Sequence, residues 1–136
     1  GIGHLITEMG YPRGTDTHTV HWMVSHPETE IYIAADQGDR PIGLVLLAHR
    51  PSLRACGRIA VIDELMVTAS WRRKGVGSAL MAHAIDRART LAVKRLEYLH
   101  AGELGEAPRA FIEACGLDAT EGRIFRLGSG DFHEDG

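Results

Sequence analysis

The sequence has few of the features that mark secreted, membrane-spanning or nucleic-acid-binding proteins. Its two cysteines, Cys56 and Cys115, form no Cys-x-x-Cys motif, which favours a cytoplasmic protein. No apolar run approaches the roughly 20 residues that span a bilayer, and the chain does not open with a signal-peptide pattern. The formal net charge is −3 and basic residues do not interleave with aromatic ones, so we expect no nucleic-acid or membrane partner.

Histidine is more frequent, but the eight histidines form no complete metal-binding pattern. His18 and His21 could share one face of a helix, yet no carboxylate or thiol completes a ligand set there. We therefore expect no metal site. His49 and His83 are expected at the surface or at its boundary with the core.

Length and hydrophobic patterning predict one α/β domain. A chain of 136 residues can bury a single core, so we expect one domain over residues 1–128 and a polar tail over residues 129–136. Apolar residues at helical spacing predict helices over residues 2–9, 14–26, 74–91 and 106–115. Short apolar runs predict strands over residues 30–35, 41–49, 58–67, 95–100 and 123–127.

The most informative segment joins the strand that ends at Val67 to the helix that follows. Residues 72–78 read Arg-Arg-Lys-Gly-Val-Gly-Ser and open that helix. Glycines allow close approach of the backbone, and the positive end of the helix dipole attracts anions. Two arginines and a lysine add positive charge. The segment therefore predicts a site for a pyrophosphate group.

Two common phosphate-binding loops do not fit this segment. A nucleotide P-loop places its lysine after the glycines, whereas Lys74 precedes Gly75 and Gly77. The dinucleotide fingerprint requires a third glycine, and Leu80 stands at that position.

The pattern that remains is Arg72-x-x-Gly75-x-Gly77, with Arg72 five residues after Val67. It resembles the acetyl-coenzyme A (acetyl-CoA) loop of the GNAT superfamily of acyltransferases. Three further segments resemble other parts of that family, and the resemblance covers nearly the whole chain. These segments are Glu8–Pro12, Gly43–Leu47 and Ala110–Leu117.

The resemblance implies an α/β fold with a mixed, largely antiparallel sheet flanked by helices. The sheet would splay between the strand ending at Val67 and the strand starting at Arg95, with acetyl-CoA in the splay. Family members usually have a first strand before the segment that here begins at Glu8, so we expect that strand to be missing, short or supplied from elsewhere. Homodimers are common in the superfamily, so a homodimer is expected as an alternative to a monomer.

The resemblance also implies which residues contact acetyl-CoA. Leu65, Met66 and Val67 would offer backbone N–H groups to the thioester and the pantetheine arm. The loop residues would bind the pyrophosphate, with charge from Arg72 and Arg73 and with Lys74 turned to solvent or to the adenosine phosphate. These loop residues are Arg72, Arg73, Lys74, Gly75, Val76, Gly77 and Ser78.

Two acids are candidates for the general base. Simple alternation puts Asp63 on one face with Leu65 and Val67, and Glu64 on the other face with Ile62. Branches of the superfamily carry an acid at each of these two positions. We favour Asp63, acting through a water, although a strand bulge could bring Glu64 into the site.

The general acid and the acceptor contacts are less well marked. The late helix of many members carries a tyrosine that protonates the departing thiolate, and Ile112 stands at that position. Tyr98 or His100 could reach the sulfur instead. If the second helix borders the acceptor pocket, His21 and Trp22 could touch the substrate.

Two functions follow from these patterns. The first is an N-acetyltransferase that acts on an amine of a small molecule or a protein. The second is a non-catalytic acyl-CoA-binding regulatory module, which Ile112 favours because isoleucine has no proton to donate. A nucleotide-binding or nucleic-acid-binding domain is a third, opposed by the negative net charge.

Overall fold

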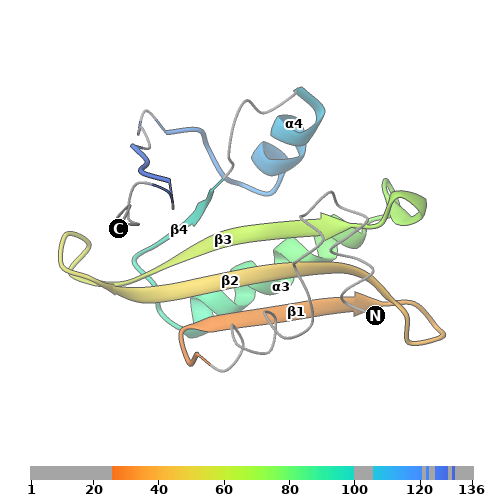
Figure 1. The fold of residues 1–136 in the computed structure, drawn as a ribbon, viewed down its shortest axis with the longest axis horizontal. Helices are drawn as coiled ribbons and strands as arrows, with labels where there is room; N and C mark the ends of the chain where they lie inside the picture. The colour runs from red at the N-terminus through yellow and green to blue at the C-terminus, as the bar shows by residue number, and fades with distance from the viewer. Residues whose placement is uncertain (1–25, 100–105, 121, 123–124, 129, 131–136) are drawn as a thin grey trace.

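The computed structural model describes residues 26–99, 106–120, 122, 125–128 and 130. Within these residues, four strands form one sheet in the order β1-β2-β3-β4 (Figure 1). The strands are β1 (Thr29–Ala35), β2 (Pro41–Ser52), β3 (Gly57–Val67) and β4 (Arg95–Tyr98). β1 with β2 and β2 with β3 are antiparallel, whereas β3 and β4 are parallel, so the predicted mixed and largely antiparallel sheet is confirmed.

The helices of the described residues are the short 3-10 turn η1 (Ala69–Trp71), α3 (Val76–Thr90) and α4 (Glu106–Ala114). Figure 1 shows α3 running along one face of the sheet, with α4 beyond β3 beside β4. None of the helices in the described ranges is long and apolar enough to cross a membrane. The helices predicted over residues 2–9 and 14–26 lie, apart from residue 26, outside the described residues.

The core lies between α3 and the sheet. Leu80, Met81 and Ala84 recur at helical spacing and pack against buried residues of β2 and β3, which are Val45, Leu47, Ala60 and Ile62. Each large apolar side chain that is fully buried stabilises the fold by about 1.5–3 kcal/mol. This packing fixes where the amino-terminal end of α3 lies against the end of β3. The strand β2 is covered on both faces, because every residue from Ile42 to Leu47 is buried.

A β-bulge interrupts β3 where the sheet begins to open. Leu46 pairs with Glu64 and Leu47 pairs with Ile62, so Asp63 is an extra residue without a partner on β2. On the other edge of β3, the parallel pairing with β4 in the described residues ends at Ile62 and Tyr98, and beyond it Leu65 and Val67 border a pocket. The sheet therefore splays after Ile62, as predicted.

The bulge overturns the predicted alternation of faces in β3. Ile62, Leu65 and Val67 all pack toward α3, whereas Glu64 pairs with Leu46 on the opposite face. The prediction that Ile62 shares a face with Glu64 is wrong, because one inserted residue shifts the period of two for every residue beyond it.

The last predicted strand is not formed in the part of it that the structure describes. Residues 125–127 have no strand pairing, and Phe125 and Leu127 are exposed. Their apolar alternation favours a strand, but a strand forms only when a neighbouring strand accepts its hydrogen bonds.

A cluster of charged and polar side chains fastens α3 to β1. Arg87 Nε and Nη2 donate to the two oxygens of Glu30 at 2.6 Å and 3.2 Å. Tyr32 also donates to Glu30, and His49 Nε2 lies 2.9 Å from its second oxygen. Arg58 Nη1 lies 3.1 Å from His49 Nδ1. We call these five residues the Glu30 cluster; within it His49 is buried, contrary to the expectation of a surface or boundary position.

Candidate functional site

The segment between β3 and α3 is closed by its own hydrogen bonds. Trp71 N donates to Thr68 O at 3.0 Å within η1, and Arg72 then turns back toward the strand. Arg72 Nε donates to Val67 O at 3.2 Å, which explains the five-residue offset between the two residues. Arg72 therefore holds the loop against the end of β3.

Two residues of the loop have left-handed backbone conformations. Arg73 has a φ of 62° and Gly75 a φ of 85°. Gly75 is the N-cap of α3, and a Cβ atom added to it would meet nothing within 4 Å. Glycine is therefore required there by the backbone conformation and not by lack of space.

We expect Gly75→Ala to lower the free energy of unfolding by about 1 kcal/mol. Alanine is strained at a positive φ, and the lower flexibility of the unfolded chain offsets only part of that cost. Asparagine tolerates this region better, so Gly75→Asn should cost less. Urea unfolding of both variants measures the difference. Equal losses in the two variants would contradict the conformational explanation.

The amino-terminal end of α3 is open to an anion. The first hydrogen bond of the helix runs from Ala79 N to Gly75 O at 3.0 Å, so the N–H groups of Val76, Gly77 and Ser78 have no acceptor within the helix. No acidic residue lies in the first turn. The positive end of the helix dipole is thus not neutralised by a side chain of its own first turn.

A pocket of about 510 Å³ adjoins this helix end. The strand β3 beyond its bulge forms one wall, the loop and the start of α3 form the floor, and α4 and Tyr98 form the rest. The lining residues are Leu65, Val67, Trp71, Arg72, Arg73, Gly75, Gly77, Ser78, Tyr98, Pro108, Phe111 and Ile112. We call this space the donor pocket.

The backbone of β3 points N–H groups toward the splay. Thr68 N donates to Ile42 O on β2, whereas Val67 O accepts from Arg72 on the opposite edge. Because successive residues of a strand direct their N–H and C=O groups to opposite edges, Leu65 and Val67 face the splay and Met66 faces β2.

Most of the residues predicted to contact the cofactor line the donor pocket. Seven of the ten do so: Leu65, Val67, Arg72, Arg73, Gly75, Gly77 and Ser78. The other three lie elsewhere. Met66 is buried, Val76 packs against the core, and Lys74 Nζ lies 5.2 Å from the centre of the Trp71 ring. These side-chain positions leave the backbone N–H of Val76 available at the helix end.

Three lining residues have no counterpart in the predicted site: Trp71, Pro108 and Phe111. Phe111 belongs to a segment that the family resemblance had marked, and its ring lies next to Gly77. Because α4 follows this position by some thirty residues in the sequence, spacing alone gives no sign of the contact.

The two candidate bases lie at the bulge and not in the donor pocket. Asp63 is exposed and Glu64 is half-buried, and burial raises the pKa of both carboxyl groups. A carboxylate with a raised pKa is a better proton acceptor near neutral pH. His100, His21 and Trp22 lie outside the described residues, so their roles stay predictions.

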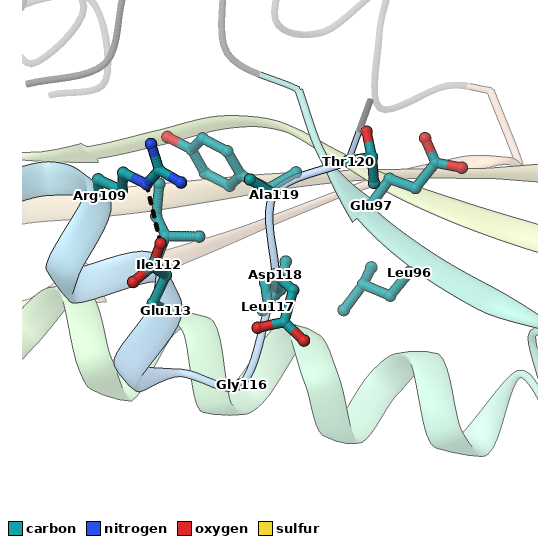
Figure 2. Close-up of a pocket in the computed structure, with 11 residues that line it drawn as sticks. Leu96, Glu97, Arg109, Ile112, Glu113, Gly116, Leu117, Asp118, Ala119 and Thr120 are labelled. Carbon is teal, nitrogen blue, oxygen red and sulfur yellow. Dashed lines mark hydrogen bonds and ion pairs between the residues drawn. The ribbon is translucent and has the colours of Figure 1, made fainter. Parts of the chain in front are cut away.

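A second pocket, of about 560 Å³, lies between β4 and α4 (Figure 2). Leu96 and Glu97 come from β4, while Arg109 Nε donates to Glu113 Oε1 at 2.8 Å on α4. Tyr98 and Ile112 line both pockets and therefore stand between them. No group of three or more metal-ligating side chains occurs among the residues that the structure describes.

A model of the acetyltransferase (GNAT) family matches residues 4–117, which is most of the chain. The protein belongs to the GNAT acetyltransferase family. No curated protein sequence matches it.

Solved structures share the fold of this GNAT protein. A protein from Agrobacterium tumefaciens str. C58, provisionally named an acetyltransferase, has a TM-score of 0.77 at 25% identity over 93% of this chain and 92% of its own. Glucosamine-6-phosphate N-acetyltransferase from Arabidopsis thaliana has a TM-score of 0.78 at 13% identity, covering 93% and 88%. Ribosomal-protein-alanine N-acetyltransferase from Brucella melitensis biovar Abortus 2308 has a TM-score of 0.70 at 20% identity, covering 93% and 87%. The last two similarities show the fold alone.

Proposed function

We propose that this GNAT protein is an N-acetyltransferase that moves an acetyl group from acetyl-CoA to a primary amine of a small molecule or a protein. The observation that carries the proposal is the open amino-terminal end of α3, which meets the donor pocket in the splay of the sheet. A helix end without acidic residues, reached through glycines, suits the pyrophosphate of coenzyme A.

The residues that line the pocket fit acetyl-CoA as the acetyl donor. The N–H groups of Val76, Gly77 and Ser78 would bind the pyrophosphate, and Arg73 would add positive charge from the pocket wall. Gly77 has no side chain to fill the space beside Phe111. The N–H groups of Leu65 and Val67 would bind the acyl arm and stabilise negative charge that develops on the carbonyl oxygen.

The proposed base is a carboxylate at the bulge of β3. A primary amine with a pKa of about 10 is mostly protonated at neutral pH, so it must lose a proton before it attacks. Glu64 suits this role because it is half-buried and burial raises its pKa. Asp63 is its neighbour in the same bulge and remains the alternative, acting through a water.

Isothermal titration calorimetry with acetyl-CoA, followed by a thiol-release assay over a panel of amines, tests this function. We expect saturable binding, and release of coenzyme A that depends on the amine. Absence of binding at millimolar acetyl-CoA would exclude the proposal. Binding without release on any amine would favour the non-catalytic acyl-CoA module, which is consistent with the side chain of Ile112 in the pocket wall.

A further inference from the structure

Among the described residues, the α4 wall of the donor pocket carries no side chain that can donate a proton. Pro108, Phe111 and Ile112 line that wall, and none of these side chains has a proton to transfer. A thiolate leaving group has a pKa of roughly 8.5, so its departure at neutral pH is assisted by a nearby hydrogen-bond donor. Within the described part of the chain, the proton donor therefore has to come from another wall of the pocket.

The residues of the donor pocket that carry polar hydrogens lie in two regions, the pyrophosphate end and the end of β4. Trp71, Arg72, Arg73 and Ser78 belong to the loop and the first turn of α3, which form the pyrophosphate end. Tyr98 is the last residue of β4 and pairs with Ile62, the last residue of β3 before the sheet splays. Tyr98 therefore stands at the apex of the splay, next to the bulge that holds Asp63 and Glu64.

The surroundings of Tyr98 keep its phenol protonated. Burial raises the pKa of Tyr98, and the negative charge of Glu64 raises it further. The charged residues of the second pocket, which Tyr98 also lines, are Glu97, Arg109, Glu113 and Asp118. At neutral pH the phenol is therefore available as a donor.

We propose that Tyr98 is the residue that donates a proton to the departing thiolate sulfur, at the place in the mechanism that Ile112 cannot fill. The inference rests on the proposed acetyltransferase function. The amine nitrogen forms a bond to the acetyl carbon while the bond from that carbon to sulfur breaks. The sulfur leaves with the bonding electron pair and takes the phenolic proton of Tyr98.

The proton balance closes through Glu64. Glu64 accepts one proton from the attacking amine, directly or through water, and Tyr98 is left as a phenolate. Glu64 then releases its proton to solvent, and the phenolate of Tyr98, whose pKa is raised, takes one back from solvent at neutral pH. The net reaction converts an amine and a thioester into an amide and a thiol, and both residues end in their starting states.

The test measures the acidity of the thiol of bound coenzyme A in wild type and in Tyr98→Phe. With protein in excess, the bound thiol is alkylated over a range of pH and the alkylated coenzyme A is quantified by mass spectrometry, so Cys56 and Cys115 do not interfere. A phenol that donates to the thiolate lowers the thiol pKa. We expect Tyr98→Phe to raise it by about one unit and to slow thiol release by about 100-fold.

Two controls make the outcomes separable. Calorimetry should show coenzyme A binding within about 3-fold of wild type in Tyr98→Phe, which also establishes that the variant is folded. Wild type grown with meta-fluorotyrosine, a more acidic phenol, should lower the bound thiol pKa further. If the bound thiol pKa is unchanged both in Tyr98→Phe and in the fluorotyrosine protein, the role of Tyr98 is overturned and the acetyltransferase proposal stays intact. Failure of wild type to bind coenzyme A would overturn the proposed function itself.

Discussion

Replacement of Gly77 by glutamate should abolish acetyl-CoA binding and leave the protein folded. A Cβ atom at this position lies 3.3 Å from Cζ of Phe111 and 3.8 Å from Cγ2 of Val67, so a longer side chain must enter the donor pocket. Its carboxylate would also place negative charge where the pyrophosphate is expected. We expect the dissociation constant measured by calorimetry to rise at least about 100-fold, which corresponds to about 2.7 kcal/mol.

The same substitution should not unfold the protein. A carboxylate in the first turn of a helix interacts favourably with the helix dipole, which offsets part of the close contact with Phe111. The free energy of unfolding should therefore change by less than about 1 kcal/mol in urea.

Ala79→Glu is the matched control for charge, because Ala79 is exposed one turn into the same helix and does not line the donor pocket. We expect its dissociation constant to stay within about 3-fold of wild type. Wild-type affinity in Gly77→Glu would show that the helix end does not hold the cofactor.

The strand, the glycine loop and the helix behind it could be predicted from the sequence because each has a local cause. Apolar runs and helical spacing mark β3 and α3, and the glycines mark the turn between them. The roles of single side chains were harder to predict. The charge of Arg72 suggests that it binds a phosphate group, yet its guanidinium also donates a hydrogen bond to Val67 O and so holds the loop against β3. Whether a cation closes a turn or faces a ligand depends on the turn geometry, which charge does not encode.

Features that depend on pairing between distant strands have no local mark in the sequence, so a bulge near Glu64 could be considered but its position could not be predicted. The bulge at Asp63 arises from the register of β3 against β2, and a sequence of alternating residues contains no mark of an inserted one. The donor pocket likewise combines Gly77 with Phe111 and Tyr98, which three different elements bring together. The burial of His49 has the same origin, because its partners Glu30 and Arg58 lie on neighbouring strands.

Replacement of Glu30 by glutamine should cost the protein more stability than removal of any exposed ion pair. Burial alone would raise the pKa of Glu30, but hydrogen bonds from Arg87, Tyr32 and His49 outweigh it and lower the pKa to about 2. The difference from its ordinary value of 4.5 corresponds to about 3 kcal/mol as an upper limit. Because Arg87 is 37% exposed and solvent screens its charge, we expect a loss of about 2 kcal/mol at neutral pH in urea unfolding.

The pH dependence separates this electrostatic contribution from a packing defect. The folded-state pKa of Glu30 lies below its unfolded value, so the unfolded chain binds the proton first as the pH falls. The stabilisation is therefore present above about pH 4.5 and is lost toward about pH 2, with less than half remaining near pH 3. The stability difference between wild type and Glu30→Gln should shrink along this course. The control is Asp86→Asn. Asp86 pairs with Arg89, and each of the two side chains is 74% exposed, so this ion pair should contribute less than about 0.5 kcal/mol to stability. A difference for Glu30→Gln that stays constant from neutral pH to about pH 3 would mean that the Glu30 cluster stabilises the contact of α3 with β1 by packing alone.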